Sequence, residues 1–582
     1  MAAAGAVLPR IKGGAFLLEE STPEQIFTVE DLDQDHWAIA RTANEFFAKE
    51  VAPNVESLLH QEPGLGVRLL RKSAELGLTA ISIPEEYGGM ELDLASSLIA
   101  EEQLGRDASY AAWHGAHTGI GTLPILYFGT AEQKKNYLPR LASAELIAAY
   151  ALTEPHAGSD ALALRTRADL SADGRHYILN GQKMWITNGG PADLFTVFAK
   201  VGGEKFSAFL VERNFGGVSS GVEEKKMGIK GSSTTALYFE NVHVPVQNLL
   251  GEVGRGHIIA FNILNMGRLK LGALSVAGAK NVLAVSLKYA KERKAFGTEI
   301  AQFGAIQHKL AEMAIRIYAA ESAAWRIAGL IQNQQPAAES MLKVVEEFAV
   351  ECSIIKVYGS EVLDYVSDEG VQIHGGYGFH QDYAVERTYR DSRINRIFEG
   401  TNEINRLLIT GMLLKRAARG QLDLMGATKR LMAEIQAGKI GAGDSDEEQR
   451  LVANAKSIAL LTLGMAYQKY GAELEKQQEV MMGIADVVME AFVMESALLR
   501  ARKLAASGKT SIAADMTAVF LREAMARVEI SARTVVGTCS AAPMLRINMS
   551  VLRKLAVYDP VDAVTVRRTI ASRLLAREKF FV

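Results

Sequence analysis

Cysteine is scarce in this sequence, with Cys352 and Cys539 the only two among 582 residues. Two thiols cannot build a disulfide framework or a four-thiolate metal site, so nothing calls for an oxidising compartment. Long apolar runs are missing too, because stretches such as residues 457–467 fall well short of the about 20 residues that cross a bilayer. A net charge of −3 lacks the basic excess that is typical of nucleic-acid-binding proteins.

Targeting signals are not evident at the start of the chain. Residues 1–10 (MAAAGAVLPR) have no basic segment ahead of the short apolar run, and they are too poor in arginine and serine for a transit peptide. We therefore expect a cytoplasmic protein, most plausibly bacterial.

The spacing of apolar residues changes along the chain and predicts several domains. A length of 582 residues suggests about three to four units. Helical spacing runs from 39 to 147, strand-like segments fill 150–251, and long helical patterns at 258–290, 305–332 and 340–364 follow. The last part is again helical, with a linker or exposed loop at Gly438 and the acidic run 444–448. The predicted limits are residues 1–148, 149–257, 258–414 and 415–582.

Strand signals are clearest in the second of these units. Residues 177–179 and 183–185, separated by Asn180 and Gly181, predict a hairpin with a two-residue turn. Residues 194–201, 207–212 and 236–244 are further strand candidates, rich in β-branched and aromatic residues.

Glu399 is the leading candidate for a catalytic residue. It stands among apolar neighbours, and Gly400 directly after it lets a ligand approach the backbone. Thr401 and Asn402 are typical of the cap of a new helix. A desolvated carboxylate at such a position can have its pKa raised and act as a base. Taken alone, it could equally be an ordinary acid of a first helical turn.

Three other segments have chemistry suited to ligand binding. The first, residues 150–160 (YALTEPHAGSD), offers hydroxyl groups. The second, residues 183–190 (KMWITNGG), puts an aromatic ring and a hydroxyl on one strand face. The third, residues 372–378 (QIHGGYG), could leave N–H groups free for a phosphate. Each has a plainer interpretation, namely a turn, a core tryptophan and a packed histidine. The glycines do not match G-x-G-x-x-G, and no metal-ligand spacing or Walker A loop is present.

In their order along the chain, these motifs resemble the acyl-CoA dehydrogenase family over residues 35–415. The resemblance rests on YALTEP at 150–155, WIT at 185–187, RKAFG at 293–297, QIHGG at 372–376 and FEGT at 398–401. Residues 415–582, FGAIQ at 303–307, NILN at 262–265 and KGGAFLLE at 12–19 are similar to the very-long-chain branch and its bacterial long-chain members.

The resemblance implies an α+β fold that is mostly α. It comprises an N-terminal helical domain, a middle β-barrel or sandwich domain and a C-terminal four-helix bundle, to which this chain adds a C-terminal helical domain. FAD would lie between the domains. The residues that would bind it are Tyr150, Leu152, Thr153, Ser159, Trp185, Ile186, Thr187, Arg293, Phe296, Gln372, Ile373, His374, Gly375, Gly376, Thr401 and Glu403.

Within that set, the resemblance assigns different parts of the cofactor. Thr153 would hydrogen-bond the pyrimidine side of the flavin, and Thr187 would lie near N5. Arg293, Phe296 and residues 372–376 would hold the pyrophosphate and adenosine of the partner subunit's FAD, which implies a homodimer. Glu403 departs from the glutamine common in the family, so its contact is an open expectation.

The resemblance also implies the reaction. Glu399 would take the α-proton of an acyl-CoA thioester while hydride leaves the β-carbon for flavin N5. The substrate-contacting residues would be Ser159, Asn265, Arg268, Phe398 and Gly400. A carboxylate of reference pKa about 4.3 is a poor base for such a proton, so burial must raise it. Some relatives carry the base on another helix, at the position of Gly267; glycine has no carboxylate, which leaves Glu399.

The small residues Ala111, Ala112, Gly115 and Ala116 match the helix that closes the acyl cavity, and they favour a long acyl chain. Close helix packing is the alternative explanation for them. Branched or aromatic acyl-CoA is a second substrate hypothesis, and an assembly or scaffold protein that kept the fold is a third. Electrons would pass to an electron-transferring flavoprotein. Membrane contact would be at most peripheral, at the inner membrane, because the acidic run at 444–448 poorly matches a basic membrane-facing helix.

Overall fold

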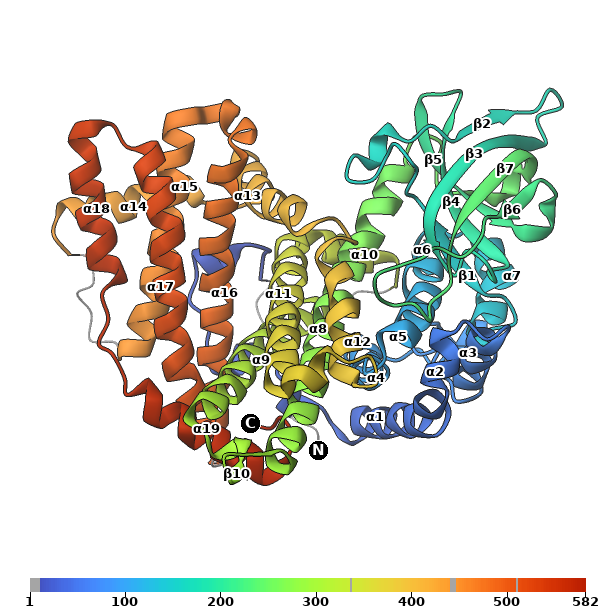
Figure 1. The fold of residues 1–582 in the computed structure, drawn as a ribbon. Helices are drawn as coiled ribbons and strands as arrows, with labels where there is room; N and C mark the ends of the chain where they lie inside the picture. Colours follow the sequence, from blue (N-terminus) through green and yellow to red (C-terminus); the bar gives the residue numbers. More distant parts are fainter. Residues whose placement is uncertain (1–10, 335–337, 440–445, 509–510) are drawn as a thin grey trace, which may run out of the picture.

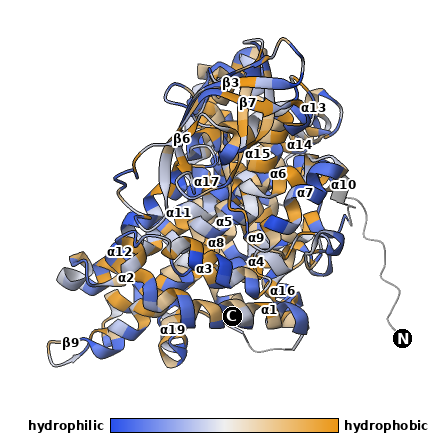
Figure 2. Ribbon diagram, turned by 90° about the vertical axis from the view of Figure 1, so that its right-hand side faces the viewer, coloured by the Kyte–Doolittle hydropathy of each residue, from blue (hydrophilic) through white to orange (hydrophobic). Residues whose placement is uncertain are grey.

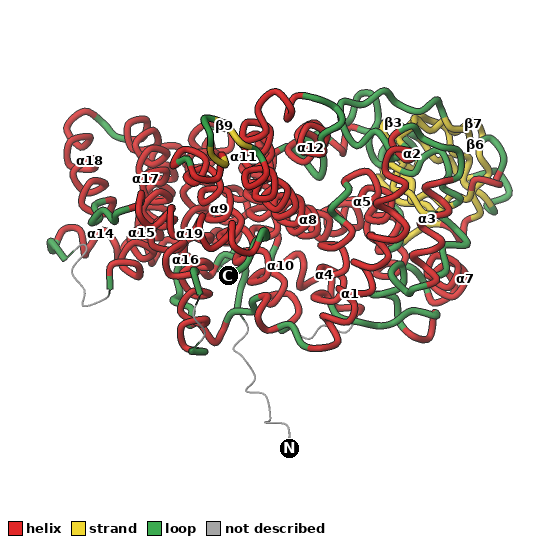
Figure 3. The backbone as a smooth tube through the Cα atoms, turned by 60° about the horizontal axis from the view of Figure 1, so that its bottom comes forward, coloured by secondary structure: helices red, strands yellow, loops and turns green. Residues whose placement is uncertain are grey.

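The structure is a computed structural model that describes residues 11–334, 338–439, 446–508 and 511–582. Most strands gather at one end of an otherwise helical molecule, and one short strand pair lies apart from them beside the central helices (Figure 3). Figure 1 shows the long helices α8, α9 and α11 in the centre, the sheet and the N-terminal helices on one side, and the C-terminal helices on the other. The predicted α+β, mostly helical fold is confirmed.

The N-terminal domain is helical, as predicted. Side-chain caps begin several of its helices: Asp33 accepts hydrogen bonds at the start of α1, and Asp93 and Asp107 do the same for α4 and α5. A six-residue π-helix, Ala116–Gly121, continues α5. The helices are α1 Gln34–Phe46, α2 Val55–Leu59, α3 Leu65–Glu75, α4 Leu94–Leu104, α5 Ala108–Gly115, α6 Leu123–Phe128 and α7 Ala131–Ala142.

The middle domain is built on one eight-stranded sheet with strand order β6-β7-β3-β2-β4-β5-β8, and β1 pairs in parallel with β4. Buried aromatic and aliphatic side chains on β4 and β5 fill the space behind it. The strands are β1 Ala148–Ala151, β2 Arg167–Leu170, β3 His176–Thr187, β4 Leu194–Val201, β5 Lys205–Glu212, β6 Val218–Ser220, β7 Thr234–Pro245 and β8 Leu249–Leu250.

The predicted hairpin at Asn180 and Gly181 is wrong. β3 runs unbroken through both residues and pairs with β7, with a register shift between Leu179 and Gly181. Asn180 forms hydrogen bonds with Asn241 of β7, so it supports the pairing of β3 with β7 and does not form a turn. A Cβ on Gly181 would lie 2.5 Å from Thr166 Oγ1, which means that the glycine permits close strand approach at a bulge.

The helical bundle follows the sheet and carries a small projecting hairpin, β9–β10 (Figure 2). The predicted helix at 340–364 is interrupted: α10 ends at Glu347 and α11 begins at Ala349. The bounds are α8 Gly256–Glu292, β9 Lys294–Ala295, β10 Thr298–Glu299, α9 Gly304–Gln332, α10 Ala338–Glu347, α11 Ala349–His374, α12 Ala384–Ser392 and α13 Asn402–Ala418.

The C-terminal extension is helical, as predicted, and packs on the bundle through α9 and α13 (Figure 1). The predicted linker lies mostly outside the described residues, and Asp446 caps α15 at its far side. The helices are α14 Leu424–Gln436, α15 Glu447–Tyr470, α16 Gln478–Ala506, α17 Ala513–Cys539, α18 Ala542–Ala556 and α19 Ala563–Arg577.

A segment of residues 12–32, here called the N-terminal strap, ties the extension to the bundle. The N–H of Gly14 donates to Glu351 of α11 at 2.7 Å. Lys456 of α15 donates to the carbonyl of Glu19 at 2.9 Å, and Arg500 of α16 pairs with Glu30 at 2.6 Å. One continuous apolar core therefore runs through bundle, strap and extension.

No helix within the described residues is long and apolar enough to cross a bilayer.

Candidate active site at Glu399

Glu399 lies in a tight turn just before α13, and its backbone is left-handed. Its φ is +57°, and that of Gly400 is +82°. A left-handed non-glycine residue is uncommon and persists only where the surroundings hold it. Thr401 ends the turn by capping α13, since its Oγ1 accepts from the N–H of Ile404 at 3.3 Å. The predicted cap is confirmed.

The carboxylate of Glu399 fills the space that Gly267 of α8 leaves open. A Cβ on Gly267 would lie 2.8 Å from Glu399 Oε2. This oxygen is buried and has no hydrogen-bond partner among the described residues. The site therefore holds a proton acceptor in an apolar setting with one oxygen left free.

Three side chains hold the turn from behind. Arg268 Nε and Asn405 Nδ2 donate to the carbonyl of Glu399 at 3.2 and 3.3 Å. Lys356 Nζ and Asn405 Nδ2 donate to the carbonyl of Gly400 at 2.7 and 2.8 Å. These contacts maintain the left-handed conformation that directs the carboxylate towards α8.

Burial raises the pKa of Glu399 to about 7, against the opposing influence of the nearby Arg268 and Lys356 cations. The same burial lowers the pKa of Lys356 to about 7. Such a carboxyl is half ionised near neutral pH, where an ordinary glutamate would be fully ionised and weakly basic.

The predicted substrate residues divide into two groups. Asn265 and Arg268 are buried beside the base, with Arg268 Nη1 donating to Asn265 Oδ1 at 2.6 Å. Phe398 and Gly400 flank Glu399 and are partly exposed. Ser159 instead lies exposed on the loop after β1.

The loop after β1 is fixed to the site side of the sheet. The Tyr150 hydroxyl donates to the carbonyl of Ala260 on α8. Its pKa is raised, first by burial and then by the nearby Glu399 carboxylate. Lys183 donates to the carbonyl of Leu152 at 3.2 Å and pairs with Glu154 at 2.7 Å. Thr153 accepts from the N–H of Met184 at 2.9 Å, which locks this loop to β3.

Trp185 is not a core residue. Its side chain is 61% exposed, and its backbone is left-handed at φ +57°. Ile186 is buried, whereas Thr187 is partly exposed. A register shift between Lys183 and Ile186 interrupts the regular alternation of β3 at the tryptophan. A large ring displayed here, and not packed inside, favours the ligand-binding interpretation over the plainer one.

The remaining predicted cofactor residues form a separate cluster at the far end of α11. Arg293 lies over the ring of Tyr377 at 5.5 Å, and Phe296, at the tip of the β9–β10 hairpin, is 95% exposed. His374 is stacked on Tyr289 and bonded to a backbone carbonyl, so it is a packed histidine. Added Cβ atoms at Gly375 and Gly376 would meet nothing within 4 Å.

This far cluster is separated from Glu399 within one chain. About 19 residues of α11 lie between Lys356 and Gly375, which is on the order of 28 Å along a helix. Thr401 and Glu403 stand on the Glu399 side, where Glu403 is exposed.

Two glycines near the end of α5, Gly115 and Gly119, border open space. Added Cβ atoms at Gly115 and Gly119 would meet nothing within 4 Å, although Gly119 is buried. Close helix packing would instead bring neighbouring atoms against such a Cβ, as at Gly66, where Trp113 lies at 2.3 Å. Room for a ligand is therefore the better explanation of these two glycines.

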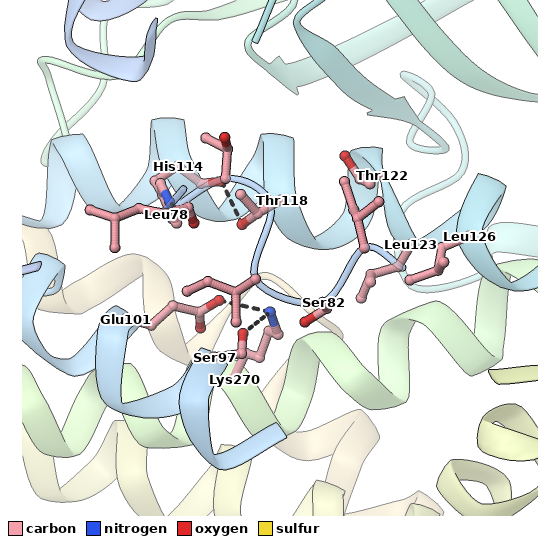
Figure 4. A pocket seen from close by; sticks show the side chains of 13 residues that line it. Leu78, Ser82, Ser97, Glu101, His114, Thr118, Thr122, Leu123, Leu126 and Lys270 are labelled. Carbon is pink, nitrogen blue, oxygen red and sulfur yellow. Dashed lines mark hydrogen bonds and ion pairs between the residues drawn. The ribbon is translucent and has the colours of Figure 1, made fainter. Parts of the chain in front are cut away.

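A small polar cavity lies nearby, between α4, the π-helix and α8 (Figure 4). Lys270 pairs there with Glu101 at 2.7 Å and with Ser97 at 3.0 Å. The cavity measures about 10 Å³, room for about one water molecule. Burial and the Lys270 cation lower the pKa of His114, which lines it, to about 4.

Several of these residues were not predicted from the sequence. Lys356 and Asn405 lie on different helices and meet the turn only through the fold, and Glu101 and Lys270 are likewise far apart in sequence. The one local signal is a lysine inside the apolar run at 350–357.

Family models match about four fifths of the chain. The matches are to the N-terminal, middle and C-terminal domains of acyl-CoA dehydrogenase, at residues 33–145, 149–242 and 254–414, and to a further acyl-CoA dehydrogenase C-terminal domain at 454–554.

Three relatives illustrate the range of similarity. A probable acyl-CoA dehydrogenase of Bacillus subtilis is 47% identical over 98% of both chains. The mitochondrial very long-chain specific acyl-CoA dehydrogenase of Rattus norvegicus is 45% identical over 58% of this chain and 51% of its own. The crystal structure of an acyl-CoA dehydrogenase complexed with FAD from Bacillus anthracis superposes with a TM-score of 0.97 at 48% identity, covering 98% of this chain and 100% of that one.

Proposed function

The chain belongs to the acyl-CoA dehydrogenase family, and from that premise we propose that it oxidises long-chain acyl-CoA to trans-2-enoyl-CoA, the first step of fatty-acid β-oxidation. It is an FAD-dependent oxidoreductase of this family. The observation that carries the proposal is the buried carboxylate of Glu399, with a pKa of about 7 and one oxygen free above Gly267.

Glu399 takes the α-proton of the thioester. A pKa near the working pH combines adequate basicity with a populated ionised form. Arg268 and Lys356 lie behind the carboxylate and limit how far burial suppresses that form. The N–H of Glu399 has no acceptor among the described residues and is available to the thioester oxygen, where negative charge develops.

The residues displayed around the site fit FAD. Trp185 exposes a large ring that a bound flavin would cover, and Phe296 exposes one that a bound adenosine would cover. Thr153 and Thr187 would supply hydroxyl groups to the flavin. Gly375 and Gly376 leave backbone room for a pyrophosphate. When bound, FAD supplies the two-electron oxidant that receives hydride from the β-carbon. The assignments of individual residues to FAD follow the family resemblance and are part of the proposal.

The far cluster at Arg293, Phe296 and residues 372–376 supports a homodimer in which each subunit completes its partner's FAD site. We further propose an electron-transferring flavoprotein as the electron acceptor, a cytoplasmic location and domain limits at residues 148, 257 and 414. Any membrane contact is peripheral in this proposal.

A long acyl substrate is favoured by the open space at Gly115 and Gly119. The test is turnover of purified holoenzyme with butyryl-, octanoyl-, palmitoyl-, isovaleryl- and phenylpropionyl-CoA, first with a dye and then with an electron-transferring flavoprotein. We expect palmitoyl-CoA to be oxidised fastest. Preference for isovaleryl- or phenylpropionyl-CoA would support the branched or aromatic alternative, and no oxidation of any thioester would support a scaffold role.

A further inference from the structure

Lys356 is a buried cation in the bundle core, on α11, between Ile355 and Val357. Its relative exposure is 0%, and burying an unpaired ammonium costs far more than burying a methylene chain. Within the described residues, Lys356 forms no direct ion pair with a carboxylate; its neighbour Glu361 pairs with Arg406 instead. Such a lysine requires a specific set of partners.

Those partners belong to the turn that carries the base. Lys356 Nζ donates to the carbonyl of Gly400 and to Asn402 Oδ1, both at 2.7 Å. Asn402 in turn donates to Ser360 Oγ and to Glu361 Oε1, each at 3.1 Å, one turn further along α11. Lys356 therefore anchors the first residue of α13 and the residue after Glu399 to one helix.

The anchoring acts on a strained turn. Left-handed backbone at a non-glycine residue is unfavourable and must be imposed by the surroundings. Arg268 and Asn405 hold the carbonyl of Glu399, whereas Lys356 and Asn405 hold the next carbonyl. Losing Lys356 leaves Asn405 alone on the second carbonyl and frees the peptide that sets the direction of the carboxylate.

The ammonium also acts on the charge of the base. The ionisable groups that influence Glu399 come from three elements: Arg268 on α8, Lys356 on α11 and Tyr150 on β1. Glu399, Glu361 and Glu403 favour the charged form of Lys356, whereas Arg268 opposes it. Lys356 and Arg268 are thus the two cations that favour the ionised form of Glu399.

We propose that Lys356 is the positioning residue of the catalytic base, holding Glu399 over Gly267 through the Gly400 carbonyl and Asn402 and stabilising its carboxylate with a buried positive charge. This inference rests on the proposed role of Glu399. It assigns to one lysine both the direction and the ionisation of the base.

The decisive variant is Lys356→Met, which keeps the length and burial of the side chain but removes charge and hydrogen bonds. The matched control is Lys456→Met on α15, another buried lysine, which pairs with Glu495 at 2.5 Å far from the site. Lys356→Arg tests rescue by a retained charge. All are purified as holoenzymes.

Two readouts separate positioning from general stability. The first is infrared difference titration of the Glu399 carboxyl, recorded in each background with and without Glu399→Gln, which needs no turnover. The second is the pH dependence of anaerobic flavin bleaching by palmitoyl-CoA. In the wild type, Glu399 and Lys356 titrate in the same range, so the observed pKa values belong to the pair.

We expect Lys356→Met to move the Glu399 titration upward by about one pH unit or more, because it removes one of the two cations that favour the ionised carboxylate. Bleaching at neutral pH then falls at least about fivefold from ionisation alone. Lys356→Arg retains the titration, and Lys456→Met changes neither readout. An unshifted carboxyl titration in folded Lys356→Met would overturn the proposal.

If Lys356→Met does not fold, Asn402→Ala decides. It removes one acceptor of Lys356 but keeps the cation, so we expect slower bleaching with the carboxyl titration in place; unchanged bleaching would contradict the proposal. Absence of bleaching in the wild type with every acyl-CoA would refute the proposed function instead. The infrared titration would then still show whether Lys356 controls the ionisation of Glu399.

Discussion

Glu399 and Gly267 work as one unit at the scale of single residues. The carboxylate of Glu399 occupies the space that the missing side chain of Gly267 leaves free. A carboxylate projecting from position 267 would therefore arrive where that of Glu399 now lies. It would also collide with the glutamate if both were present, since a Cβ there lies 2.8 Å from Oε2.

This geometry predicts the result of exchanging the two residues. Gly267→Glu combined with Glu399→Gly should recover part of the flavin bleaching lost in Glu399→Gly alone, with an altered chain-length preference. Glycine suits the left-handed backbone at 399, so the turn persists. Gly267→Glu combined with Glu399→Gln should recover less, because the glutamine still fills the space. Equal bleaching by both double variants would contradict this packing argument.

The burial and raised pKa of this residue agree with the sequence prediction, but the residues that support it could not be predicted. A glutamate before Gly-Thr-Asn indicated a base at a helix entrance, and the structure gives it the expected burial and raised pKa. Lys356 and Asn405 come from helices whose approach to the turn depends on tertiary packing. No spacing in the sequence encodes that approach, so both were missed.

At the scale of elements, we propose that the π-helix Ala116–Gly121 and the end of α5 form one wall of the acyl-chain cavity. A π-helix widens the backbone by one residue per turn and is often found at functional sites. Its Gly119 is buried yet borders open space. At Gly119, the lack of a side chain therefore leaves open space that a larger residue would fill.

Filling that space should shorten the preferred substrate. Gly119→Val is expected to lower the palmitoyl-to-butyryl ratio of kcat/KM by about tenfold or more, since a misplaced methylene in an apolar pocket changes discrimination by roughly 10–200-fold. Gly537→Val, on an exposed face of α17 with nothing within 4 Å, is the control and should leave the ratio unchanged. A palmitoyl preference that survives Gly119→Val would show that the acyl chain runs elsewhere.

Most elements could be predicted from periodicity, and the errors have a common cause. Long helices such as α8 and α9 and the buried strand β4 appear close to their predicted limits because burial enforces a regular apolar pattern. Asn180-Gly181 was misread because the same dipeptide suits a turn and a bulge. Only the approach of Thr166 and the pairing with Asn241 decide between them.

At the scale of the whole molecule, the N-terminal strap joins parts that are hundreds of residues apart. Its contact with α11 depends on a buried acid: burial raises the pKa of Glu351 to about 7, with the Gly14 N–H acting in the opposite direction. A raised folded-state pKa means that the stabilising neutral form is fully present below the unfolded value of 4.5 and is lost as pH rises through 7.

Glu351→Gln should therefore stabilise the protein progressively as pH rises. At pH 5 the variant and the wild type should melt at nearly the same temperature, whereas at pH 8 the variant gains up to about 3 kcal/mol. The measurement is thermal melting at both pH values. Glu473→Gln, at an exposed carboxylate, is the control. A gain that is equal at pH 5 and pH 8 would contradict the assignment of a raised pKa.

The two separated clusters of cofactor residues predict an obligate dimer. Light scattering should report twice 63.1 kDa, and dilution that dissociates the dimer should release FAD, because Arg293 and Phe296 would serve the partner's site. The check is FAD fluorescence during dilution alongside mass measurement. Full FAD occupancy in a proven monomer, or a stable tetramer of the whole chain, would contradict this arrangement.

The central claim is that Glu399 is the base, and its most direct test is one anaerobic mixing experiment. Glu399→Gln holoenzyme is mixed with palmitoyl-CoA, and the flavin absorbance is followed beside the wild type. Because loss of a general base costs on the order of 10²–10⁴ in rate, we expect the variant to remain yellow, to bind the thioester and to bleach at least about a hundredfold more slowly. Bleaching of the variant at the wild-type rate would contradict the account.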